Sequence, residues 1–136
     1  MGTIVVGYVP QPEGRAALRT AADEAKLRGA RVVVINSNKG GRSLESDDAL
    51  LYEKELDDVR RRLADAGIDH EVRQLVRGKE PAEDLIAVAE ETGADLIVIG
   101  LRRRSPVGKL VLGSNAQRVL LDAQCPVLAV KVTEEG

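Results

Sequence analysis

The chain has 136 residues, enough for a single domain that buries roughly 68% of the surface its unfolded form would expose. With 43% apolar residues, two Tyr and neither Phe nor Trp, the core must consist of Val, Leu, Ile and Ala, and almost no aromatic ring remains to stack on single-stranded nucleic acid. The net charge of −2 argues against a general nucleic-acid-binding surface. We therefore expect one domain over residues 1–136 that does not bind nucleic acid.

The N-terminus and the cysteine content indicate the compartment. Met1-Gly2-Thr3 leads directly into an apolar run and lacks the layout of a signal peptide. No stretch approaches the roughly eighteen apolar residues of a membrane helix. The single Cys125 cannot form an internal disulfide, so no oxidising compartment is required. The sequence predicts a cytoplasmic protein that makes no membrane contact.

Strands and helices alternate along the first half of the chain. Short apolar runs rich in β-branched residues predict strands at Thr3–Val9 and Arg31–Ser37. Between them, Gly14–Arg28 carries apolar residues at helical spacing and is followed by a glycine, a typical helix stop. A polar loop with two glycines is expected at Asn38–Ser46, and helical spacing resumes at Asp47–Ala66.

The alternation continues to the end of the chain. Asp69–Val76 alternates apolar and polar residues, as expected for a strand near a sheet edge. A helix is predicted at Ala82–Glu91, after a proline that suits its first turn. Asp95–Gly100 is the most apolar of the predicted strands, and the last helix and strand are expected at Ser114–Ala123 and Pro126–Val132.

This order of elements, βαβαβαβαβ, predicts an α/β fold. Strands separated by helices pair in parallel through right-handed crossovers. For five strands we expect a flavodoxin-like, Rossmann-like three-layer sandwich with strand order 3-2-1-4-5. Ligands of such sheets bind at the carboxyl ends of the strands where the order reverses, here between the first and fourth strands. Those strands end at Gly7–Val9 and at Gly100, so a binding site is predicted there.

The segment Leu96–Asn115 has the organisation of a phosphate-binding turn. An apolar run ends at Gly100, a basic loop follows, and Gly113 and Ser114 open the last helix. Backbone N–H groups converge at such a helix start, and the helix dipole favours an anion. Three simpler interpretations stay open: Gly113-Ser114 is only a helix cap, Gly100 merely ends a strand, and Arg102–Arg104 is a solvated basic loop.

In this segment the chain resembles the universal stress protein family. The family signature after the fourth strand is Gly-x2-Gly-x9-Gly-Ser/Thr, with which its ATP-binding members hold phosphates and ribose. Here Gly100, Arg103 and Gly113-Ser114 stand at that spacing, and the resemblance extends over essentially the whole chain, including the ending Cys-Pro-Val-Leu-Ala-Val. The resemblance implies a stress-response sensor that binds ATP or another adenine nucleotide.

Two positions depart from the ATP-binding pattern. Arg103 replaces the second glycine, and its guanidinium can grip a phosphate in bidentate fashion although it changes the geometry. Val9 stands where ATP-binding members have an Asp that contacts the nucleoside. These departures favour a second hypothesis, a dimeric interaction module without nucleotide that uses Arg102–Arg104 to bind an acidic partner. A third is a slow nucleotide hydrolase, in which the basic loop steadies the transferred phosphoryl group.

The nucleotide-binding hypothesis divides the predicted site into two ends. The start of the last helix would supply backbone and hydroxyl contacts to phosphate, the arginines would supply charge, and the ends of the first two strands would line the nucleoside. The predicted residues are Gly7, Tyr8, Val9, Asn36, Ser37, Gly100, Arg102, Arg103, Gly113, Ser114 and Asn115.

No catalytic or metal-binding constellation is evident in the sequence. One histidine, His70, and one cysteine cannot build a tetrahedral metal site. His70 is expected to be a solvated strand residue, and Cys125 a small core residue that no histidine activates. The sequence therefore does not predict an enzyme.

The last strand suggests self-association. In the expected order it lies at a sheet edge, where a long apolar strand would promote aggregation if it stayed uncovered. The family resemblance implies that it pairs antiparallel with its copy across a two-fold axis. We predict a homodimer through Val127, Leu128, Ala129, Val130 and Val132.

Overall fold

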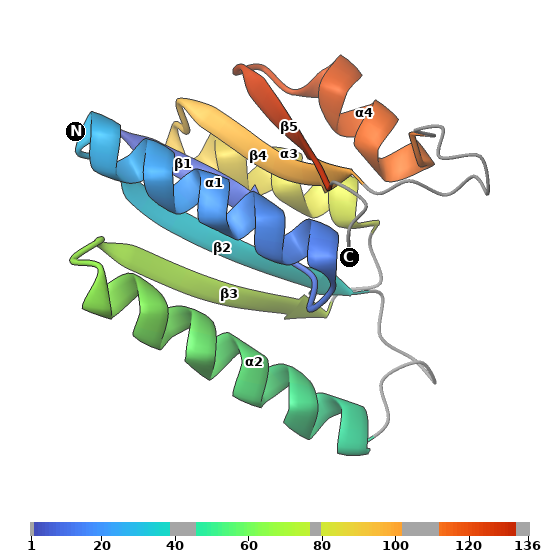
Figure 1. The fold of residues 1–136 in the computed structure, drawn as a ribbon. Helices are drawn as coiled ribbons and strands as arrows, with labels where there is room; N and C mark the ends of the chain where they lie inside the picture. The colour runs from blue at the N-terminus through green and yellow to red at the C-terminus, as the bar shows by residue number, and fades with distance from the viewer. Residues whose placement is uncertain (1, 39–45, 77–79, 102–111, 133–136) are drawn as a thin grey trace.

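The computed structural model describes residues 2–38, 46–76, 80–101 and 112–132. Residues 39–45 of the predicted loop and the basic residues Arg102–Arg104 lie outside these ranges. Strands and helices alternate along the chain (Figure 1) as β1 (Thr3–Gly7), α1 (Pro12–Arg28), β2 (Arg31–Asn38), α2 (Ser46–Asp65), β3 (His70–Val76), α3 (Pro81–Thr92), β4 (Leu96–Leu101), α4 (Ser114–Asp122) and β5 (Val127–Lys131).

The strands form one five-stranded sheet of order β3-β2-β1-β4-β5. Every neighbouring pair is parallel, as βαβ connections require. The α/β fold and the strand order predicted from the sequence are therefore confirmed.

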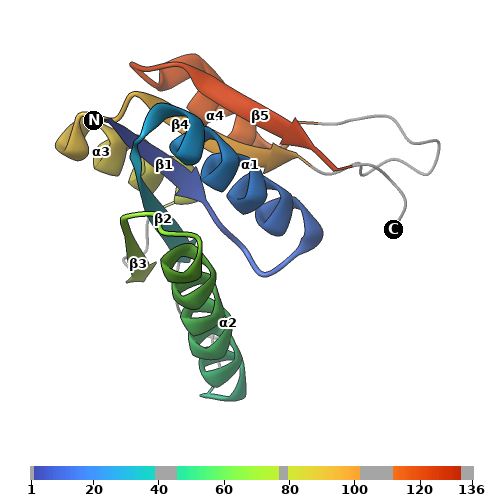
Figure 2. The same cartoon turned by 60° about the vertical axis from the view of Figure 1, so that its left-hand side comes forward.

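Helices cover both faces of the sheet (Figures 1 and 2). Ile4 and Val6 of β1 are buried in a cluster with residues of α1 and α2, whereas Val5 lies in a second cluster with residues of α3 and α4. Successive side chains of a strand point to opposite faces. The unbroken apolar runs that mark the central strands in the sequence thus reflect burial on both sides.

Helix α1 begins at Pro12, two residues before the predicted start at Gly14. Proline suits the first helical position, because its missing N–H group would have no partner there and its fixed φ fits a helix. The helix ends at Gly29, whose φ of 64° closes a left-handed C-terminal cap. Its inner face consists largely of alanines, which allow the helix axis to lie close to the sheet.

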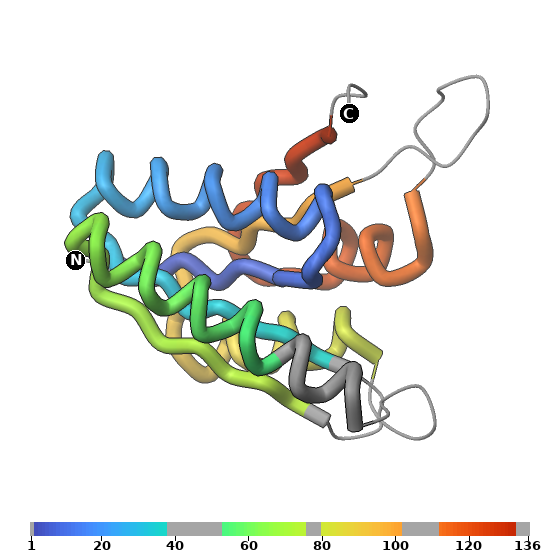
Figure 3. The backbone as a smooth tube through the Cα atoms, turned by 60° about the horizontal axis from the view of Figure 1, so that its bottom comes forward, coloured from blue at the N-terminus to red at the C-terminus, as the bar shows by residue number. Residues whose placement is uncertain are grey.

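Helices α3 and α4 both begin at the carboxyl edge of the sheet, as Figure 3 shows. Glu80 and Glu83 form a capping box at the start of α3, with Pro81 at its first position. The N-cap of α4 is Gly113, which has no side chain of its own to form a capping hydrogen bond. Ser114 is the first helical residue, so the cap position of the Gly113-Ser114 pair falls on the glycine.

None of the helices in the described ranges is long and apolar enough to cross a membrane.

Candidate functional site

A cleft of about 230 Å³ opens at the carboxyl edge of the sheet, between β1 and β4 and the starts of α3 and α4. It lies at the point where the strand order reverses, which is the position that the sequence predicts for a ligand. Its lining residues are Gly7, Tyr8, Val9, Ile35, Ser37, Pro81, Ala82, Leu85, Ile99, Gly100, Asn115, Ala116 and Val119.

The topology of the sheet creates this cleft. After β1 the chain turns to α1 on one face, and after β4 the next helix, α4, lies on the other face. The segments that leave two neighbouring strands therefore diverge, and the space between them stays open. Residues of both strand ends, Gly7 and Gly100, border it.

Most of the cleft wall is apolar. Three residues of the buried core beneath the cleft also line it: Ile35 of β2, Leu85 of α3 and Val119 of α4. Together with Ile99 they offer a hydrophobic surface built from four different elements. Such a wall accommodates a flat or aliphatic group and excludes water from around it.

Two polar side chains interrupt this wall. The Ser37 hydroxyl donates a hydrogen bond of 2.5 Å to Oδ2 of Asp84. Asn115 Oδ1 accepts a hydrogen bond of 2.9 Å from the backbone N–H of Ala82, which ties the first turn of α4 to that of α3. Two helix starts thus meet at one side of the cleft. The first turn of α3 carries the carboxylates of Glu83 and Asp84, whereas that of α4 has no acidic residue, so its backbone N–H groups favour an anion there.

A family model described as the universal stress protein family matches residues 1–131. The chain belongs to the universal stress protein family. A universal stress protein from Mycolicibacterium smegmatis is 45% identical over 128 residues, which cover 94% of this chain and 96% of that protein.

Solved structures of universal stress proteins share the fold. One from Archaeoglobus fulgidus superposes with a TM-score of 0.82 at 39% identity and covers 96% of this chain and 99% of that one. A structure of an Archaeoglobus fulgidus universal stress protein in complex with dAMP has a TM-score of 0.76 at 34% identity and covers 96% and 98% of the two chains.

The structure brings several predicted site residues of this universal stress protein together at the cleft. Gly7, Tyr8, Val9, Ser37, Gly100 and Asn115 are among its lining residues. Gly113 and Ser114 stand directly before Asn115 at the start of α4 and are not among them. Arg102 and Arg103 lie outside the described residues.

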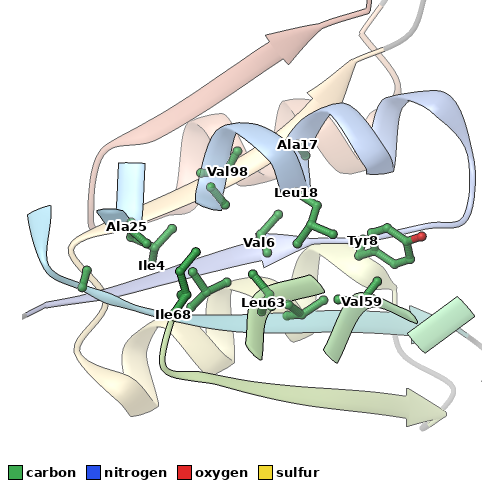
Figure 4. Packing of buried hydrophobic residues seen from close by; sticks show 14 of the residues in the cluster. Ile4, Val6, Tyr8, Ala17, Leu18, Ala25, Val59, Leu63, Ile68 and Val98 are labelled. Carbon is green, nitrogen blue, oxygen red and sulfur yellow. The ribbon is translucent and has the colours of Figure 1, made fainter. Parts of the chain in front are cut away.

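Tyr8 and Asn36 direct their side chains away from the cleft. The Tyr8 ring lies in the core between α1 and α2 (Figure 4), and its hydroxyl donates to Glu55 Oε1 at 2.8 Å. We infer that Tyr8 borders the cleft with its backbone. Asn36 is buried and donates through Nδ2 to the Tyr8 carbonyl at 3.0 Å, so the structure does not bring it to the cleft.

The two glycines at the strand ends lie close to neighbours on opposite faces of the sheet. A methyl group at Gly7 would come within 3.0 Å of Leu85 Cδ1, on the cleft side. A methyl group at Gly100 would overlap the backbone carbonyl of Glu13 in α1, on the opposite side of the sheet. The absence of a side chain at Gly100 is thus required by helix packing, independently of any ligand.

Sequence reasoning missed Asp84, a buried carboxylate directly behind the cleft wall. A signal was present, because Asp84 stands one helical turn before the buried Val88 and therefore on the inward face of α3. An acidic residue on such a face needs a polar partner inside the protein. The partner is Ser37, which is 47 residues away in the sequence.

Cys125 is a partly buried residue at the margin of the core. It packs against the core cluster formed with α3 and α4, and burial raises the pKa of its thiol. Within the described part of the chain, no group of three or more His, Cys, Asp or Glu residues could hold a metal ion.

Proposed function

We propose that this universal stress protein binds an adenine nucleotide in the cleft at the carboxyl ends of β1 and β4 and acts as a stress-response sensor. The observation that carries the proposal is the meeting of an apolar cleft with the start of α4 at the reversal point of the sheet. The dAMP complex of a relative that is 34% identical and shares the fold supports an adenine nucleotide as the ligand class.

In this proposal the phosphate lies at the start of α4. Gly113, Ser114 and Asn115 form the N-cap and first turn of that helix, and N–H groups there favour an anion. Gly100 borders the same end of the cleft. The side chains of Arg102 and Arg103 would add charge to this end and compensate for the missing second glycine of the family signature.

The nucleoside would lie against the apolar wall, toward β2. Strands β2 and β4 flank β1, so they are two strand spacings apart, roughly 10 Å, which suits the length of a nucleoside with one phosphate. Val9 stands at the rim with 38% of its surface exposed, where the ATP-binding pattern has an Asp. Affinity in this chain would therefore depend on the apolar wall and the phosphate end.

Calorimetric titration of the purified protein with AMP, ADP and ATP tests this function. We expect Ser114→Glu to lower the affinity at least tenfold, because it places a carboxylate among the phosphate donors. Leu121→Glu is the matched control, since it adds the same charge to the same helix at a position that is 81% exposed and outside the cleft lining. Equal affinities in both variants would show that the phosphate lies elsewhere.

A second candidate function is a dimeric interaction module without nucleotide. The exposed Val9 favours it, because an apolar side chain there suits a protein contact as well as a ligand. In this case Arg102–Arg104 would bind an acidic partner. Mass spectrometry of small molecules released by denaturation separates the two candidates: released nucleotide supports the sensor, whereas an empty protein that also fails to bind added ATP supports the module.

We also propose a cytoplasmic homodimer with one domain over residues 1–136. Strand β5 lies at an edge of the sheet. Its apolar residues Val127, Leu128, Ala129 and Val130 are only partly buried in the single chain. Val132 follows the strand and donates its N–H to Leu101. Antiparallel pairing of two β5 strands would cover this edge.

A further inference from the structure

Ser37 and Asp84 form a buried hydrogen-bonded pair at the β2 end of the cleft. Asp84 belongs to the first turn of α3 and is 1% exposed. Its carboxylate accepts the Ser37 hydroxyl at 2.5 Å. Ser37 is a lining residue of the cleft whereas Asp84 is not. A ligand would therefore contact the serine, with the aspartate behind it.

This pairing determines what the serine can offer a ligand. A hydroxyl has one proton and two lone pairs, so a serine that is free to rotate can donate or accept. A carboxylate has no proton to give, and the Ser37 proton is therefore committed to Asp84. Toward the cleft, Ser37 presents lone pairs, which accept a hydrogen bond and repel another acceptor.

The position of Ser37 identifies the part of the ligand that meets it. Ser37 lies on β2, on the far side of β1 from β4 and the start of α4. A nucleotide whose phosphate is held at α4 therefore directs its base toward β2. Around Ser37 the wall is formed by apolar residues such as Ile35 and Leu85, where an unmatched polar contact is costly.

We propose that Ser37, held as an acceptor by Asp84, makes the cleft selective for a purine with an amino group at C6 over one with a carbonyl oxygen there. The inference rests on the proposed nucleotide-binding function. The 6-amino group of adenine donates to the serine oxygen, whereas the 6-oxo group of hypoxanthine places a second acceptor against it. Ser37 is the specificity-determining contact, and Asp84 is a positioning residue that acts through it.

The test compares AMP with IMP, which differ only at C6 and N1 of the base, by calorimetric titration. We expect the intact protein to bind AMP about tenfold more tightly than IMP. Ser37→Ala removes the acceptor and should bring the two dissociation constants to within about threefold. In Asp84→Asn the new amide can donate a hydrogen bond to the serine oxygen, which frees the hydroxyl proton to face the cleft. The affinity for IMP should therefore rise relative to the affinity for AMP.

Thr92→Val serves as the control, since Thr92 lies at the other end of α3 and its hydroxyl donates to the Val88 carbonyl. It should keep the selectivity of the intact protein. If Asp84 had a purely structural role, Asp84→Asn would weaken the binding of AMP and IMP equally and leave the ratio of their dissociation constants unchanged. That result would overturn the assignment of Asp84 as a positioning residue. If Asp84→Asn does not fold, Ser37→Ala decides alone, because a retained tenfold preference in that variant contradicts the inference.

The outcomes separate this inference from the proposed function. Equal binding of AMP and IMP by the intact protein would overturn the selectivity and leave nucleotide binding in place. If neither nucleotide binds, the proposed function fails and the selectivity fails with it.

Discussion

Tyr8 shows how one polar contact joins three elements behind the cleft. It follows β1, and its hydroxyl donates to Glu55 of α2 at 2.8 Å. The guanidinium of Arg15 in α1 stands 3.8 Å from the same carboxylate. Burial, the hydrogen bond to Glu55 and the charge of that residue raise the pKa of Tyr8 to about 12.

This shift predicts a pH-dependent contribution to stability. The folded-state pKa of Tyr8 lies above the ordinary value of 10.0, so its contribution is fully present below pH 10 and is lost as the pH rises to 12. At pH 8 we expect Tyr8→Phe to lower the free energy of unfolding by about 1 kcal/mol. Urea denaturation between pH 8 and 12 should show this difference shrink, and a constant difference would contradict the assignment.

The packing of helix α1 on strand β4 explains why the first position of the family signature, Gly100, is a glycine. Gly100 faces α1, and the backbone carbonyl of Glu13 occupies the space that a side chain would need. Gly14 makes a similar close approach to the backbone of Val9. The first turn of α1 is thereby held against the end of β4 and fixes one border of the cleft.

Gly100→Ala is therefore expected to destabilise the fold by about 1–3 kcal/mol. The methyl group would meet backbone atoms, which cannot move aside without shifting α1. Gly7→Ala is the matched control at the neighbouring strand end, where the methyl group meets the end of the Leu85 side chain. Urea denaturation of both variants checks the difference, and equal losses would show that the approach of α1 is not the cause.

At the scale of the whole molecule, β5 decides whether the chain can pair with a second copy. In the pairing with β4, the Pro126 carbonyl accepts from Ile97 and the Val132 N–H donates to Leu101. Backbone groups of alternate residues point to the same side of a strand. The N–H groups of Val127, Ala129 and Lys131 therefore point away from β4, toward the open edge.

Ala129→Pro tests the proposed homodimer on this basis. Proline removes an N–H group that faces the edge and leaves the hydrogen bonds to β4 in place. By light scattering at micromolar concentration, we expect twice the mass of one chain for the intact protein and for the control Ala129→Val, and the mass of one chain for Ala129→Pro. A monomeric intact protein would contradict the homodimer.

The fold was predictable because its signals are local. The strand at Leu96–Leu101 appears in the sequence as an unbroken apolar run, and its burial on both faces of the sheet explains that run. The start of α1 was misplaced by two residues, because the proline at Pro12 suits both a turn before a helix and the first helical position.

The site was predictable only in part. The strand order placed Gly7 and Gly100 at one cleft, because parallel strands end at a common edge. The strand order could not show which of the neighbouring residues Asn36 and Ser37 faces the cleft. Neighbouring side chains of a strand alternate, and which of the two faces receives α3 is decided by the assembled structure.

Periodicity and apolar runs depend on neighbouring residues, so the order of elements, the topology that follows from it and the edge at which a ligand would bind could be inferred from the sequence. The close approach of the α1 backbone to Gly100 and the hydrogen bond from the Ser37 hydroxyl to Asp84 become visible only in the folded chain. Both depend on contacts between residues far apart in the chain. Helical spacing marks Asp84 as inward-facing, but a single sequence carries no local signal for the partner that it meets.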